Sequence, residues 1–176
     1  MRPVAPKRKT KSPETDRRAK AETRKPTVVA SAGKRRPVSS FYVVGLGASA
    51  GGLEALRSFF AAVPAKSGAA FVVIQHLAPE HRSQMVELLA THTPAPVHQI
   101  EDGMTTQPNH VYVIPPGKCV KIFGGKLMLI GPEKRTPHLP IDQFFRSLAE
   151  DRGELAIGIV LSGTGSDGTL GVRALK

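Results

Sequence analysis

The chain has 176 residues, which is enough for one domain with a core of its own. Its formal net charge is +11, but residues 1–38 contain 13 of the 25 Lys and Arg residues and only 3 of the 14 Asp and Glu residues. The remainder carries a net charge of +1, which excludes the strongly basic surface typical of a nucleic-acid-binding domain. The single cysteine, Cys119, excludes an intrachain disulfide and a cysteine-based zinc site and indicates a cytoplasmic protein.

Residues 1–38 form a basic N-terminal tail with almost no apolar periodicity. Such a composition cannot bury enough surface to offset chain entropy, so we expect the tail to be disordered. The tail lacks the apolar core of a secretory signal and the aromatic residues that stack on bases. We expect it to act either as a solvated leader that helps solubility or as an electrostatic contact for acidic partners, anionic lipid or nucleic acid. No run in the chain approaches the roughly 20 apolar residues of a membrane span.

The first half of the remaining sequence alternates between strand and helix patterns. Buried strands are predicted at "FYVVGLG" (41–47) and "AAFVVIQHL" (69–77), since both are short, apolar and β-branched. Helices are predicted at "GGLEALRSFFAAV" (51–63) and "RSQMVELLATH" (82–92) from their apolar spacing. A β-α-β-α order predicts a parallel sheet with right-handed crossovers.

The second half contains a different element before the strand–helix pattern returns. A short strand at 110–117 precedes "KCVKIFGGKLMLIG" (118–131), which predicts a β-hairpin around Gly124-Gly125, with Cys119 as a packing residue. A helix at 139–153 and a buried strand at 155–161 follow, and a further helix starts at 170. We therefore predict an α/β domain over residues 39–176, with a doubly wound, mainly parallel sheet and a β-hairpin insertion. Because only two helical turns follow the last strand, we expect the C-terminal part of the domain to be missing.

The glycine-rich stretch "GLGASAGG" (45–52) permits three interpretations. A dinucleotide-binding loop would require an acidic residue at the end of the second strand, but that strand ends at His76 and the first carboxylate is Glu80. The stretch also fits G-x-S-x-G, the strand-to-helix turn that exposes a nucleophilic serine, here Ser49. The third possibility is a turn of small residues that only allows strand and helix to pack closely.

Two further residues strengthen the nucleophile interpretation. His76 ends the second predicted strand, and Asp167 lies in the turn after the last one. Because the carboxyl ends of parallel strands lie at one edge of a sheet, Ser49, His76 and Asp167 are expected at the same edge, where they can form a catalytic triad. A structural role for His76 and a turn-forming role for Asp167 remain open. The chain order Ser…His…Asp differs from that of the α/β-hydrolases.

Five blocks in order resemble the chemotaxis protein-glutamate methylesterases of the CheB type. They are "VVGLGASAGGLEAL", "VVIQHLAPEH", "EDGMTTQPNHVYVIPPG", "PHLPIDQFFRSLA" and "IGIVLSGTGSDGTLGVRALK". The sequence of the last block is most similar to the N-terminal methylesterase module of methylesterase–methyltransferase fusion proteins. Stand-alone members carry an N-terminal receiver domain whose phosphorylation releases inhibition. The basic tail does not fit such a domain, so we expect no phosphorylation control in cis.

The resemblance implies a cytoplasmic serine hydrolase that demethylates glutamate γ-methyl esters on chemoreceptor helices; some relatives also deamidate receptor glutamines. It implies Ser49 as nucleophile, His76 as general base and Asp167 as the group that orients His76. An oxyanion hole is implied at the backbone N–H groups of Ala50 and Thr164, and neither a metal nor an organic cofactor is implied.

Two further residues, His138 and Asp142, match a family block near the site, where helix capping is the alternative role. Methylated receptor helices, and in fusion proteins a methyltransferase module, are the implied partners.

Two alternatives to an active enzyme remain. The domain could be catalytically impaired and act only as a module that binds receptors or partners, or it could be a regulatory domain that binds a nucleotide through residues 45–52. A metal site is disfavoured because Pro79 separates His76 from His81, so the two cannot share a helix face.

Overall fold

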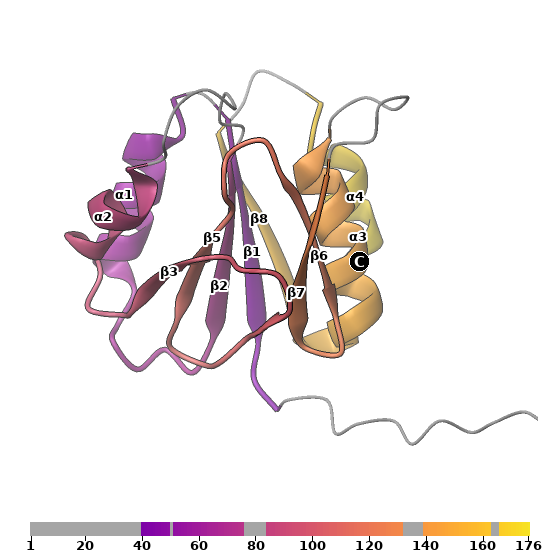
Figure 1. Cartoon of the computed structure of the whole chain (residues 1–176), viewed down its shortest axis with the longest axis horizontal. Helices are drawn as coiled ribbons and strands as arrows, with labels where there is room; N and C mark the ends of the chain where they lie inside the picture. Colours follow the sequence, from indigo (N-terminus) through magenta and orange to yellow (C-terminus); the bar gives the residue numbers. More distant parts are fainter. Residues whose placement is uncertain (1–39, 50, 76–83, 132–138, 163–165) are drawn as a thin grey trace, which may run out of the picture. The chain divides into compact units, whose positions relative to one another are not determined.

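A computed structural model describes residues 40–49, 51–75, 84–131, 139–162 and 166–176. Within these ranges the chain forms two β-sheets and four α-helices (Figure 1). The basic tail and the domain boundary predicted after residue 38 lie outside the described residues. None of the helices that the structure describes is both long and apolar enough to cross a membrane.

The larger sheet has five strands, all parallel, in the spatial order β3-β5-β2-β1-β8 (Figure 1). Its members are β1 (Val43–Ala48), β2 (Ala70–Gln75), β3 (Val97–Gln99), β5 (Val111–Val113) and β8 (Ala156–Ser162). Every residue of β1 and β2 is buried, as expected for strands that are covered on both faces. The predicted doubly wound, mainly parallel architecture is therefore confirmed.

The two faces of this sheet are covered by different elements (Figure 1). Helices α1 (Leu53–Ala62) and α2 (Met85–Ala90) pack on one face. The other face is covered by α3 (Pro140–Arg152), α4 (Thr169–Ala174) and an antiparallel sheet of β4 (Met104–Thr105), β7 (Lys126–Ile130) and β6 (Cys119–Phe123). A short 3-10 helix, Gly153–Leu155, joins α3 to β8.

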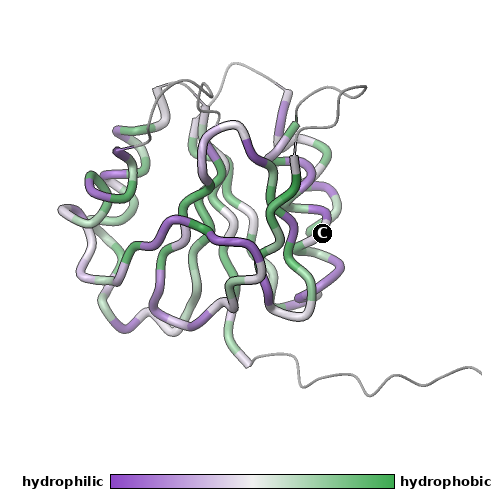
Figure 2. The backbone as a smooth tube through the Cα atoms, in the orientation of Figure 1, coloured by the Kyte–Doolittle hydropathy of each residue, from purple (hydrophilic) through white to green (hydrophobic). Residues whose placement is uncertain are grey.

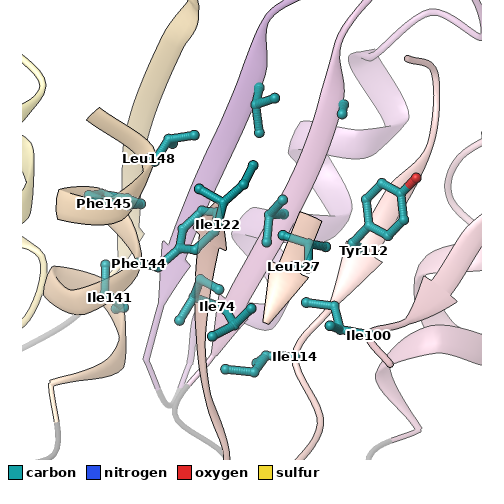
Figure 3. Close-up of a cluster of buried hydrophobic side chains, with 14 residues drawn as sticks. Ile74, Ile100, Tyr112, Ile114, Ile122, Leu127, Ile141, Phe144, Phe145 and Leu148 are labelled. Atoms are coloured by element: carbon teal, nitrogen blue, oxygen red, sulfur yellow. The ribbon is translucent and has the colours of Figure 1, made fainter. Parts of the chain in front are cut away.

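The core on the α3 side brings the two sheets together. Side chains of the small sheet, such as Ile122 and Leu127, meet Ile74 of the parallel sheet and Phe144 of α3 (Figure 3). Hydrophobic residues accordingly concentrate on the central strands (Figure 2). Cys119 is buried in β6 at 5% exposure, which confirms its predicted packing role.

Two glycines of the 45–52 stretch allow α3 to pack closely on β1. Gly45 and Gly47 lie inside β1, where α3 crosses the strand. A Cβ on Gly45 would lie 2.8 Å from the ring of Phe145, and one on Gly47 would lie 2.6 Å from Ile141. Only a strand without side chains at these positions lets the helix approach so closely. This packing accounts for the G-x-G spacing without a dinucleotide.

The predicted elements from β1 to α4 are present, with ends that differ by a few residues. The prediction of a buried strand is wrong for β8, whose residues are partly buried or exposed, because β8 is at the end of the sheet that the structure describes. The structure adds two short strands that the sequence pattern did not indicate, β3 and β4. Each has three residues or fewer. Their own periodicity is therefore too short to detect, and they are extended because they pair with β5 and β7.

The tip of the β6–β7 hairpin is held by the end of α3. The Asp151 carboxylate accepts the N–H groups of Gly124 and Gly125, the second at 3.1 Å. Both glycines have positive φ, 55° and 76°, as the tight turn requires. Asp151 also pairs with Arg152 at 3.1 Å, and Arg152 donates to the hydroxyl of Thr106 at 3.0 Å. The carboxylate thus joins the end of α3 to the turn of the hairpin.

Replacing Asp151 with alanine is expected to lower the free energy of unfolding by about 1–3 kcal/mol. The change removes the acceptor of two N–H groups and leaves Arg152, which is 4% exposed, without this carboxylate. Urea denaturation followed by circular dichroism measures the effect. Glu150→Ala, at an exposed position on the same helix, is the control and is expected to change stability by less than about 0.5 kcal/mol. Equal effects of the two substitutions would contradict a specific role for Asp151.

Candidate active site

Ser49 lies directly after β1, in a tight turn that leads into α1. Its N–H donates to the Ser162 carbonyl at 3.2 Å, and its carbonyl accepts the N–H of Gly52 at 2.8 Å. Gly51, inside this turn, has φ of 93°, a conformation that favours glycine. A strand, a tight turn and a helix therefore place Ser49 at the carboxyl edge of the parallel sheet, as the G-x-S-x-G pattern predicts.

Gly52 makes the close approach between this turn and the sheet possible. A Cβ at Gly52 would lie 2.7 Å from both the Cβ of Ala48 and the Oγ of Ser162. Any larger residue would push the start of α1 away from the strands. Gly52 is thus needed for close packing, which supports the interpretation of this stretch as a turn that lets strand and helix approach closely, while the nucleophile interpretation stays a prediction.

Asp167 lies at the same edge, after β8, the strand that pairs with β1. Its two carboxylate oxygens accept the N–H groups of Ile141 at 3.0 Å and Asp142 at 2.9 Å. These donors belong to the first turn of α3, where the N–H groups have no partner within the helix. Asp167 therefore caps α3, and the two bonds define the orientation of its carboxylate.

Asp142 makes the reciprocal connection. Its side chain is buried at 4% exposure and accepts the N–H of Gly171 in α4 at 2.6 Å. A Cβ on Gly171 would lie 2.6 Å from the Cβ of Phe145, so α4 approaches α3 as closely as the backbones allow. Asp142 in α3 thus binds the backbone of α4, and Asp167, which precedes α4, binds the backbone of α3. Asp142 therefore caps the first turn of α4, and its role near the site stays a prediction.

The remaining predicted site residues, His76, Ala50, Thr164 and His138, lie outside the described residues. The structure does describe the residue before His76. Gln75 pairs with Ala48, the residue before Ser49, and Ala48 also pairs with Ser162. The last row of paired residues at this edge is therefore Gln75, Ala48 and Ser162. Ala48 is the final residue of β1 and directly precedes Ser49.

Sequence reasoning missed Ser162 and the capping bonds of both aspartates. The only local signal for Ser162 was a polar residue that ends an apolar run. The bonds of Asp167 join residues 25 and 26 positions apart, and that of Asp142 spans 29 positions, so no short pattern records them.

A second group of titratable side chains lies away from this edge. His110, which precedes β5, stacks on His98 with ring centroids 5.1 Å apart, and their ring nitrogens are 2.9 Å apart. Burial lowers the pKa of His110, and the neighbouring His98 lowers this pKa further. Because His110 is at the amino end of its strand, this pair is not part of the edge that carries Ser49 and Asp167.

The described residues thus define a doubly wound α/β domain in which a serine and a helix-capping carboxylate follow two adjacent parallel strands at their carboxyl ends. Comparison with known proteins identifies the family to which this α/β domain belongs. The family profile described as CheB methylesterase matches residues 44–176, and the chain belongs to this family.

Individual relatives support the assignment. The chain is 30% identical over 167 residues to a protein-glutamate methylesterase/protein-glutamine glutaminase of Salmonella typhimurium, covering 92% of this chain and 48% of the relative. A protein of the same name from Bordetella pertussis is 35% identical over 144 residues, covering 78% and 41%. The crystal structure of the Thermotoga maritima CheB methylesterase catalytic domain superposes with a TM-score of 0.68 at 28% identity, covering 77% of this chain and 75% of that one. The chain spans less than half the length of each of these two curated relatives.

Proposed function

We propose that this chain is a serine hydrolase that converts glutamate γ-methyl esters on chemoreceptors to glutamate and methanol. The observation that carries the proposal is the position of Ser49 in a strand–turn–helix at the edge that also holds Asp167. Membership of the CheB methylesterase family and the names of the relatives support the same reaction. Hydrolysis of receptor glutamine amides is a second reaction of the same site.

The proposed roles follow from the chemistry of acyl transfer. A serine hydroxyl is a weak nucleophile, so His76 takes its proton as Ser49 Oγ attacks the ester carbonyl. The N–H groups of Ala50 and Thr164 stabilise the oxyanion. The proton passes from His76 to the leaving methoxide. Methanol then departs and leaves the glutamyl group as an ester on Ser49. Water, deprotonated by His76, cleaves this acyl-enzyme, releases the glutamate carboxylate and restores the serine.

Asp167 has two compatible roles in this proposal. An ionised carboxylate offers about four acceptor positions, and the two bonds to α3 use one on each oxygen. The carboxylate is therefore held in one orientation, and its second proposed role is to accept the ring N–H of His76. A carboxylate in this position keeps the imidazole in the tautomer that accepts the serine proton.

The proposed substrate is a methylated helical segment of a cytoplasmic receptor domain, and a methyltransferase of the CheR type is the proposed partner that supplies the ester. This places the activity in the cytoplasm. The assignment requires no metal or organic cofactor, since every chemical step is carried by the named residues.

Incubation of the purified chain with receptor membranes that carry radiolabelled methyl esters tests the proposal. We expect labelled methanol to be released at a rate proportional to the concentration of the chain and well above that of membranes alone. Circular dichroism of the same sample establishes that the domain is folded. Binding of the folded chain to the membranes without release of methanol would overturn the hydrolase and favour the receptor-binding module.

A further inference from the structure

The pairing of β1 with β8 changes register at the turn that carries Ser49. The two strands pair regularly from Val43 with Ala156 to Gly47 with Val160, but Ala48 then pairs with Ser162, so Leu161 is an extra residue. This is a β-bulge, a feature that redirects a side chain and is over-represented next to active sites. Without it, the side chain of Ser162 would lie on the same face as that of Val160.

The bulge directs the Ser162 side chain toward the start of α1. Its Oγ is 2.7 Å from the position that a Cβ on Gly52 would occupy. Its carbonyl accepts the Ser49 N–H at 3.2 Å. Ser162 therefore lies beside both ends of the turn: its carbonyl binds Ser49, and its hydroxyl lies where a side chain at Gly52 would be.

The hydroxyl of Ser162 is buried and unpaired. Two buried side-chain oxygens in the part of the chain that the structure describes have no hydrogen-bond partner, Ser162 Oγ and Gln75 Oε1. Both belong to the row of the sheet below Ser49, on either side of Ala48. An unpaired buried polar group destabilises a fold, and natural proteins keep few of them. Both groups lie next to the turn that carries Ser49, in the row of the sheet that supports it.

We infer that Ser162 is a positioning residue for Ser49: its hydroxyl, directed by the β-bulge, sets the distance between the sheet and the Gly52 end of the turn. The inference rests on the proposed function, because the position of the nucleophile matters only if Ser49 attacks. Small displacements of a reacting group can lower a rate by about 10- to 100-fold. Ser162 does not contact the reacting atoms in this assignment.

Replacement of Ser162 by alanine separates positioning from a merely structural role. We expect kcat for methanol release to fall by about tenfold or more, with KM changed less than about twofold. The midpoint of thermal unfolding is expected to stay the same or rise, because an unpaired hydroxyl is removed. Ser162→Thr, which retains the hydroxyl and suits a strand, is expected to restore kcat to within about threefold of the wild type.

Hydrogen exchange supplies a readout that does not depend on activity. The Ser49 amide, which donates to the Ser162 carbonyl, is expected to exchange faster in Ser162→Ala and at the wild-type rate in Ser58→Ala, an exposed position on α1. Unchanged exchange and unchanged kcat in Ser162→Ala would overturn the inference. A fall in kcat of Ser162→Ala that is explained by a lower unfolding temperature would also overturn the inference. If the folded wild type releases no methanol, the proposed function fails, and the exchange of the Ser49 amide still decides whether Ser162 positions the turn.

Discussion

Replacing Ser49 with alanine is expected to lower kcat for methanol release by at least about 10³-fold. The change removes the only atom that can form the acyl-enzyme in the proposed mechanism, so the residual rate reflects the oxyanion donors and binding alone. The fold is expected to remain intact, because the bonds that hold the turn use the backbone N–H and carbonyl of Ser49. Radiolabelled methanol release gives the rate, and a urea titration gives the stability.

Ser58→Ala is the matched control, since it makes the same substitution at an exposed position of α1. Its rate is expected to equal that of the wild type. A fluorophosphonate probe, followed by peptide mass spectrometry, is expected to label Ser49 in the wild type and in the control. Retention of more than about a tenth of the wild-type rate by folded Ser49→Ala would show that another group is the nucleophile.

Replacing Asp167 with asparagine is expected to lower kcat by at least about 100-fold and to destabilise the domain by about 1–3 kcal/mol. Each oxygen of Asp167 accepts one N–H of α3, at 3.0 Å from Ile141 and 2.9 Å from Asp142. An amide has one oxygen and one NH₂ group, so one of these donors would face another donor. The substitution also removes the negative charge that would stabilise a protonated His76 during the reaction.

The two consequences are separated by measuring kcat at a temperature where the variant is fully folded. Asp102→Asn is the control, because Asp102 also accepts a backbone N–H, that of Leu129 at 2.8 Å, but lies in the small antiparallel sheet region. We expect Asp102→Asn to keep the wild-type kcat. If folded Asp167→Asn also keeps the wild-type kcat, Asp167 is only a helix cap and the triad assignment fails.

Much of the fold could be predicted because its signals are local. The buried runs of β1 and β2 and the periodic apolar residues of α1 are sufficient for a parallel α/β sheet. Glycines 124 and 125 predict the hairpin for the same reason, since a tight turn depends on its own residues. The short strands β3 and β4 escaped prediction because their extended conformation comes from their partners.

The candidate site likewise has one part that local sequence predicts and another part that depends on distant segments. Ser49 was identifiable because the turn that presents it has its own pattern of small residues. The edge that it shares with Asp167 followed from the rule that parallel strands end on one side of a sheet. The orientation of the Asp167 carboxylate could not be predicted, because it depends on where the first turn of α3 lies in space.

Short-range pattern therefore establishes the class of fold, the turn that carries the serine and the edge at which the polar residues gather. Folding of the whole domain decides how these residues are held. The caps between α3 and α4 and the bulge that turns Ser162 toward Gly52 both depend on contacts between distant segments. The physical reason is that turn and strand preferences arise from a few adjacent residues, whereas the direction of a carboxylate or hydroxyl depends on the nearest backbone donors and on the space left by packing.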